Sequence, residues 1–167
     1  MGQLVVALLA ERAGARFKAH RSGNEVAEIR IGDVPVTLAR PRSYMNVSGR
    51  PVAALAGFYK IPPDHLAVVH DELDIAYGAV RPKLGGGDNG HNGLRAITAA
   101  LGTREYYRVR FGIGRPPGRM EPATFVLRDF SAAERKELPF FVDRCADATE
   151  TLVTKGLAEA QNAFGTD

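Results

Sequence analysis

A glycine-rich segment at residues 85–94, GGGDNGHNGL, constrains the fold of this chain more than any other feature. It lies between a predicted strand, Val80–Leu84, and a predicted helix, Leu94–Leu101. Glycine tolerates positive φ and leaves no side chain between the backbone amides and a ligand. A helix that starts near Asn92 would direct free amides and the positive end of its dipole toward this loop. The segment therefore predicts either a close approach to an anionic or ester oxygen, or a surface turn.

The length and composition indicate one domain, residues 1–167, with a buried core. No apolar run reaches the length of a membrane span, and no signal-peptide pattern opens the sequence. The single cysteine, Cys145, is typical of a reducing cytoplasm, and its apolar neighbours predict a place in the core. We therefore expect a cytoplasmic protein.

Strands and helices alternate along the chain. The patterns predict a hairpin with a Gly32-Asp33 turn and a short, fully apolar strand at Leu66–His70. A capping-box pattern at Ser131 and Glu134 predicts one helix start, and Pro139 predicts the start of a second helix that runs to about Lys155. The other predicted elements are helices at Gln3–Ala13, Ser48–Tyr59 and Leu157–Phe164 and the hairpin strands Val26–Ile31 and Val34–Ala39. This order predicts an α/β fold with a twisted, mixed and mostly parallel sheet flanked by helices.

The charge distribution points to a polyanionic partner. The net charge of +3 divides into +7 for residues 1–119 and −4 for residues 120–167. In the predicted strand Tyr107–Gly114, Arg108 and Arg110 alternate with apolar residues. The alternation predicts one basic and one apolar face, and nucleic acid is a candidate ligand of the basic face.

Three polar clusters lie at strand ends or helix starts, where open α/β sheets place their ligands. In the cluster at residues 44–49, an amide side chain could bind a substrate or only cap a helix. The carboxylates of the His70–Asp74 cluster could hold a metal, orient a histidine or be solvated. The third cluster is the glycine segment, in which His91 is the histidine that lies inside a candidate site.

Several enzyme classes do not fit these clusters. A phosphate-binding G-x-x-x-x-G-K-[ST] loop is absent from the sequence, which excludes a P-loop ATPase. The G-x-G-x-x-G match lacks an acidic residue at the end of the next strand, which argues against a nicotinamide enzyme. The sequence has no Ser-His-Asp order and no Cys/His metal spacing. The residues alone thus indicate a hydrolase or an anion-binding module.

Taken together, the motifs closely resemble the bacterial peptidyl-tRNA hydrolase family. They follow one another in order over nearly the whole chain: SYMNVSG at 43–49, VVHDELD at 68–74, KLGGGDNGHNGLR at 83–95, RVRFGIGRP at 108–116 and FVLRDFS at 125–131. The resemblance implies a monomeric α/β hydrolase that cleaves the ester between peptide and tRNA and recycles tRNA from aborted translation. It implies peptidyl-tRNA as the substrate, with no metal and no cofactor.

The resemblance also implies roles for individual residues. Asp71 resembles the carboxylate that orients and polarises the catalytic histidine, and His91 resembles the loop histidine beside the cleft. Asn46 and Asn92 resemble the amides that contact the peptide-ester end of the substrate, and Tyr44 and Met45 resemble the residues that line its pocket. Lys83 and Arg110 resemble the cations that face the tRNA phosphates.

Two departures from the family pattern stand out. The loop reads Asp88-Asn89, and an acidic Asp88 would slightly oppose phosphate binding. The family opens with a strand, a G-x-N-P-G-x-x-Y loop and a T-R-H-N-x-G segment whose histidine is the general base, whereas this chain begins at a position that aligns just after that His-Asn pair. We therefore expect the first central strand and the base to be missing and the chain to be impaired and poorly stable.

Three explanations of this second departure compete. The first is a misassigned start or a truncated chain, the second is a non-catalytic relative that binds tRNA, and the third is another base, supplied by His91 with Asp71. A metal-dependent phosphoesterase built on Asp71, Glu72 and Asp74 is a further alternative.

Overall fold

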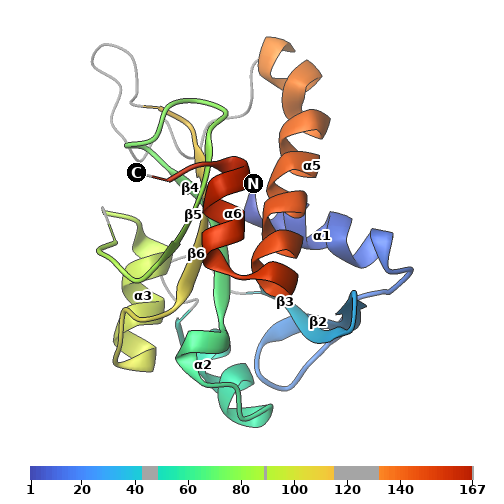
Figure 1. Cartoon of the computed structure of the whole chain (residues 1–167). Coiled ribbons are helices and arrows are strands. Elements are labelled where there is room, and N and C mark those ends of the chain that lie inside the picture. The colour runs from blue at the N-terminus through green and yellow to red at the C-terminus, as the bar shows by residue number, and fades with distance from the viewer. Residues whose placement is uncertain (43–48, 89, 115–131, 167) are drawn as a thin grey trace.

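The computed structural model of the chain describes residues 1–42, 49–88, 90–114 and 132–166. Its elements are, in chain order, α1 (Gly2–Arg12), β1 (Lys18–Ala19), β2 (Asn24–Ile31), β3 (Val34–Pro41), α2 (Gly49–Phe58), η2 (Pro63–His65), β4 (Ala67–Glu72), β5 (Val80–Leu84), α3 (Asn92–Leu101), β6 (Tyr107–Gly112), α5 (Ala132–Lys155) and α6 (Leu157–Phe164) (Figure 1). The predicted α/β class is confirmed.

The strands form two sheets, ordered β1-β2-β3 and β4-β6-β5. Within the described residues, parallel pairing is confined to β4 with β6, and the other strand pairs are antiparallel. The β4-β6-β5 sheet is therefore mixed, and the strands as a whole are less parallel than the alternation of strands and helices suggests.

The predicted hairpin is present and is longer than the alternation indicates. Gly32 adopts a φ of +58° in the turn, a conformation that glycine reaches without a steric penalty. At the far end of β2, Asn24 is fully buried and its Nδ2 donates to the Pro51 carbonyl at 2.8 Å. The pairing of β2 and β3 runs from Ile31 opposite Val34 to Asn24 opposite Pro41, where Asn24 also contacts α2.

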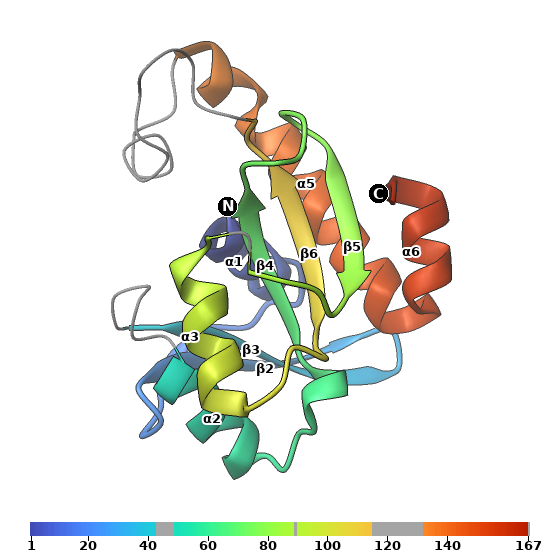
Figure 2. The same ribbon diagram turned by 90° about the vertical axis from the view of Figure 1, so that its left-hand side faces the viewer.

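Helices cover both faces of the β4-β6-β5 sheet (Figure 2). On one face, Val109 and Phe111 of β6 belong to a core with residues of α1, α5 and α6, including Cys145. Burial raises the pKa of the Cys145 thiol to about 12, so the predicted core role of this cysteine is confirmed. On the other face, Leu94 and Ile97 of α3 pack with Tyr106 in a second, smaller cluster.

Helix α5 runs through Pro139, so the predicted helix start at this residue is wrong. Proline removes one hydrogen bond from a helix interior, a cost that further packing must offset. The ring of Phe141 packs beside Tyr77 and Phe111, and Cys145 and Ala148 are fully buried, so the turns after Pro139 are anchored on the sheet. Ser131 lies outside the described residues. Over the described part of the chain, each helix is too short or too polar to cross a bilayer.

We expect two glycines of α2 to respond oppositely to alanine. A Cβ on Gly49 would collide with the Ala96 carbonyl of α3, whereas a Cβ on Gly57 would meet nothing within 4 Å. Gly49→Ala should lower the free energy of unfolding by about 1–3 kcal/mol. Gly57→Ala should raise it by about 0.4–1 kcal/mol, because alanine restricts the unfolded chain. Urea unfolding measures both variants, and equal stabilities would contradict the close packing of α2 on α3.

Candidate active site

The carboxyl end of β4 and the amino end of α3 meet and form the candidate site (Figure 2). His70 and Asp71 come from the end of β4, while His91 caps α3 and Asn92 is its first residue. The ring centroids of His70 and His91 are 5.0 Å apart, in an edge-on arrangement. The fold thus brings together groups that belong to separate motifs in the sequence.

The cap that His91 provides determines which of its nitrogens is available. Its Nδ1 accepts a hydrogen bond from the backbone N–H of Leu94 at 3.1 Å. In the neutral ring the proton is therefore on Nε2, because a nitrogen that accepts a hydrogen bond carries no proton. Burial lowers the pKa of His91, and the nearby Asp71 carboxylate opposes this shift. His91 is therefore arranged to donate a hydrogen bond, and protonating its Nδ1 would break the cap.

His70 lies beneath this corner as a buried, neutral ring. Only 4% of its surface is exposed, and its Nδ1–H donates to the Asp71 carbonyl at 2.9 Å. Burial lowers the pKa of His70 to about 3, and the neighbouring His91, Arg108 and Arg110 add to the shift. Its Nε2 has no hydrogen-bond partner within the described residues. Within the described residues, one ring nitrogen of this buried histidine therefore remains unsatisfied.

The Asp71 carboxylate is only partly compensated. Its Oδ2 lies 3.5 Å from the amino group of Met1, and its Oδ1 is buried with no hydrogen-bond partner among the described residues. Alternation along β4 directs Asp71 and Glu72 to opposite faces of the sheet. In the parts of the chain that the structure describes, no group of three His, Cys, Asp or Glu side chains is placed to hold a metal ion.

Four cations gather on the sheet face that α3 covers. The strand register pairs Arg110 with His70 on one side and Arg81 on the other, and it pairs Arg108 with Lys83. The predicted alternation in β6 is therefore present, but Arg108 and Arg110 are only 2% and 6% exposed. The expectation of an open basic face on β6 is wrong, because the helix and the glycine loop lie over it. Lys83 is partly exposed, whereas the Nε of Arg110 donates to the Arg81 carbonyl at 3.1 Å.

Asp88 closes the glycine loop. Its Oδ1 accepts the Gly90 N–H at 3.0 Å, and its Oδ2 lies 3.6 Å from the Nε of Arg95. The hydrogen bond from Gly90 lowers the pKa of Asp88, so the carboxylate remains charged and is used within the loop. The charge of Arg95 partly offsets that of Asp88, so the repulsion that we expect between Asp88 and a phosphate is reduced. Asn89 lies outside the described residues.

The first polar cluster cannot be placed in this geometry, because Tyr44, Met45 and Asn46 lie outside the described residues. One polar residue of the site had no individual role in the sequence analysis. Arg108 donates to the carbonyls of Gly86 and Gly87, behind the glycine loop. A charged residue between apolar positions of a strand, close to a glycine loop, is the signal that could have indicated this contact.

We expect the free energy of unfolding to fall as the pH drops below 6.5. The pKa values of His70 and His91 are both lower in the fold than the ordinary 6.5, so the unfolded chain binds protons that the fold does not. This stability is complete above pH 6.5 and is lost as the pH falls, down to about 3 for His70. His70 alone should contribute a slope of about 1.4 kcal/mol per pH unit.

Urea unfolding over this pH range measures the slope. His70→Asn should flatten it, whereas the exposed His65→Asn should leave it unchanged. A His70→Asn slope parallel to that of the unaltered chain would contradict the burial of a neutral His70.

Comparisons with known proteins agree with this geometry. A family model described as "Peptidyl-tRNA hydrolase" matches residues 1–167. The peptidyl-tRNA hydrolase of Frankia alni is 62% identical over 163 residues, covering 98% of this chain and 83% of that protein. The one from Streptomyces coelicolor is 61% identical, covering 98% and 84%.

Solved structures are similar as well. A crystal structure of peptidyl-tRNA hydrolase in complex with N-propanol has a TM-score of 0.89 and 31% identity, covering 99% of this chain and 86% of that one. The peptidyl-tRNA hydrolase of Acinetobacter baumannii has a TM-score of 0.87 and 32% identity, covering 96% and 84%. The chain belongs to the peptidyl-tRNA hydrolase family.

Proposed function

We propose that this chain acts as a cytoplasmic monomer that hydrolyses the ester between peptide and tRNA and recycles tRNA from aborted translation, without metal or cofactor. The observation that carries the proposal is the junction of β4 and α3, where the Asp71 carboxylate acts on His91 and His91 caps the helix that begins at Asn92. The cationic sheet face beside them supplies attraction for an RNA backbone. The family membership supports the same substrate.

The reaction adds water to the ester carbonyl and releases a peptide carboxylate and the ribose hydroxyl of the tRNA. We assign the side-chain amides of Asn92 and Asn46 to the peptide-ester end, with Tyr44 and Met45 lining the pocket. The Nε2–H of His91 would donate to the oxygen on which negative charge develops. A neutral donor suits this task, because it needs no change of charge before the reaction.

The tRNA phosphates would lie along the cationic face. Lys83 is partly exposed, and its Nζ lies 2.8 Å from the position a Cβ on Gly86 would occupy, so its charge is beside the loop. Arg110 is buried and would act mainly through the potential that it adds from beneath. Binding should therefore weaken as salt rises, as is general for phosphate contacts.

Turnover depends on the base that activates water. The family resemblance implies a histidine from a T-R-H-N-x-G segment, oriented by the carboxylate that Asp71 matches. His91 is a poor substitute, because its Nδ1 is engaged in the cap and its Nε2 carries the proton. We infer that His91 is not the base that activates water.

Placing the family's strand and T-R-H-N segment ahead of Met1 should raise kcat by roughly 10²–10⁴, the usual contribution of general base catalysis. Release of peptide from an N-blocked aminoacyl-tRNA measures the rate for both forms, and His→Ala in the added segment is the matched control. Equal kcat values for the two forms would contradict the inference and favour a base within the present chain.

Asp71→Asn in the extended form should lower kcat by roughly 10²–10⁴, because the amide cannot stabilise a charged histidine. Asp64→Asn, which alters an exposed carboxylate beside His65, should have no effect. The assay contains a chelator, so that a metal-dependent reaction would be lost in every sample. Tight binding of tRNA by the extended form without release of peptide would favour the non-catalytic RNA-binding alternative.

A further inference from the structure

Arg108 is a buried charge at the centre of the sheet. It lies on β6, is 2% exposed and contacts the glycine loop. The loop crosses the sheet on the side of α3 (Figure 2). A guanidinium removed from water is costly unless its N–H groups find acceptors. The positions of those acceptors therefore indicate what the residue does.

The acceptors that Arg108 contacts are backbone carbonyls. Its Nη2 donates to the Gly86 carbonyl at 2.8 Å and to the Arg104 carbonyl at 3.4 Å, and its Nη1 donates to the Gly87 carbonyl. The planar fork of arginine suits two neighbouring acceptors, which lysine cannot engage in the same way. Arg108 thus holds two successive peptide units of the loop.

These contacts fix the direction of the loop amides. Cis peptide bonds are absent from the described residues, and in a trans peptide the N–H points away from the carbonyl of the same unit. With the Gly86 and Gly87 carbonyls turned toward Arg108, the N–H groups of Gly87 and Asp88 face the opposite side of the loop. Gly87 is exposed, so this side is open to a ligand.

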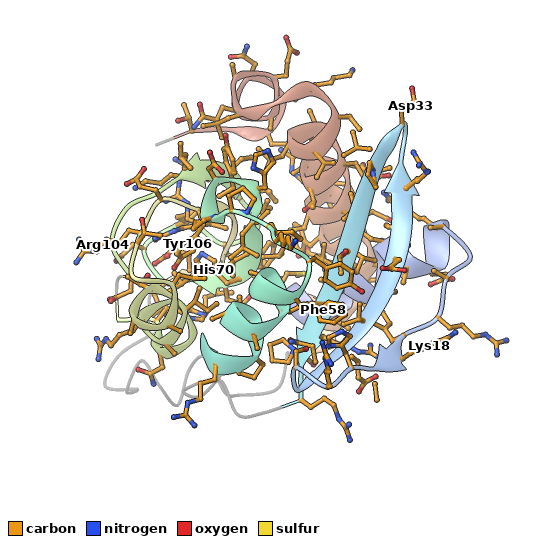
Figure 3. The ribbon with its side chains drawn as sticks, turned by 90° about the horizontal axis from the view of Figure 1, so that it is seen from below. Lys18, Asp33, Phe58, His70, Arg104 and Tyr106 are labelled. Carbon is orange, nitrogen blue, oxygen red and sulfur yellow. The ribbon has the colours of Figure 1, made fainter. Side chains whose placement is uncertain are left out.

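The same arginine is coupled to α3 through Tyr106. The guanidinium carbon of Arg108 lies 4.7 Å from the centre of the Tyr106 ring. The Tyr106 hydroxyl lies 2.9 Å from the Thr98 Oγ1 and donates to the Leu94 carbonyl at 3.3 Å. Tyr106 lies in the interior of the molecule, whereas the side chain of Arg104 reaches its edge (Figure 3). One buried unit therefore supports both the glycine loop and the helix that begins at Asn92.

We propose that Arg108 is a positioning residue for the substrate: it turns the amides of Gly87 and Asp88 toward an anionic oxygen of the peptidyl-tRNA and does not itself contact RNA. This inference rests on the proposed function. It assigns to the loop a pair of backbone donors and to Arg108 a role that differs from that of the partly exposed Lys83.

Salt dependence distinguishes these two roles. A residue that contacts phosphate displaces counterions, so its removal lowers the slope of log Kd against log salt by about 0.7–0.9. A residue that only orients backbone amides weakens binding at every salt concentration and leaves the slope unchanged. The probe is a peptidyl-tRNA in which an amide replaces the ester, so that binding is measured without cleavage.

We expect Arg108→Met to bind this probe roughly 10- to 100-fold more weakly, with an unaltered salt slope, because displaced binding groups lose much of their effect. Arg108→Lys, which keeps the charge but not the fork, should be intermediate. Lys83→Met should lower the slope. A reduced slope in Arg108→Met, or full affinity in that variant, would overturn the proposal.

Amide hydrogen exchange gives a second readout that needs no substrate. The N–H groups of Gly87 and Asp88 should exchange faster in Arg108→Met, whereas Arg104→Met, which alters an exposed arginine of the same region, should match the unaltered chain. If the unaltered chain does not bind the probe, the proposed function fails and the exchange rates alone decide this inference. If Arg108→Met does not fold, Arg108→Lys is compared in its place, and exchange equal to that of Arg104→Met would overturn the proposal.

Discussion

The central position of β6 is the constraint on which the rest of the structure depends. This strand pairs parallel with β4 and antiparallel with β5, so its register aligns residues of all three strands in rows. One row joins His70, Arg110 and Arg81, and another brings Lys83 beside Arg108. Because strand alternation sends the apolar residues of β6 to α5 and α6, the charged rows are left on the face of α3 and the glycine loop.

Burying arginines on that face creates a demand for acceptors. The glycine loop meets it for the Nη atoms of Arg108 with the carbonyls of Gly86 and Gly87, while the Arg108 Nε has no partner among the described residues. Arg110 uses the Arg81 carbonyl. A side chain would be strained at Gly86, where φ is +104° and a Cβ would lie 2.8 Å from the Lys83 ammonium, whereas a Cβ on Gly87 would meet nothing within 4 Å. Gly86 is therefore explained by a backbone conformation that lets the loop present two successive carbonyls to a buried charge.

The parts of the fold that follow from local patterns were predictable from sequence. The hairpin turn at Gly32, the strand Val80–Leu84 and the helix Leu157–Phe164 each carry their own signal and are present. Pro139 was misread because the packing of later residues of α5 offsets a local cost. The burial of Arg108 and Arg110 was missed for a similar reason: alternation identifies a face, but only the tertiary fold determines what covers it.

The candidate site, too, could be predicted from the sequence only in part. Asp71, His91 and Asn92 could be proposed from their motifs, because each lies at a strand end or a helix start. The tautomer of His91 depends on the hydrogen bond from the Leu94 N–H, and the unsatisfied Nε2 of His70 depends on the burial of that ring, and neither follows from the residue types in a motif. The sequence therefore identified the groups, and the packing determined which of their atoms can act.

The most direct test of this account is ¹⁵N NMR of the histidine side chains, with and without the amide-linked peptidyl-tRNA. The account predicts a neutral His91 protonated on Nε2, whose signals shift when the ligand binds, while those of the exposed His65 remain unchanged. A His91 protonated on Nδ1, or one whose signals are unaffected by a bound ligand, would contradict the placement of the substrate at the junction of β4 and α3.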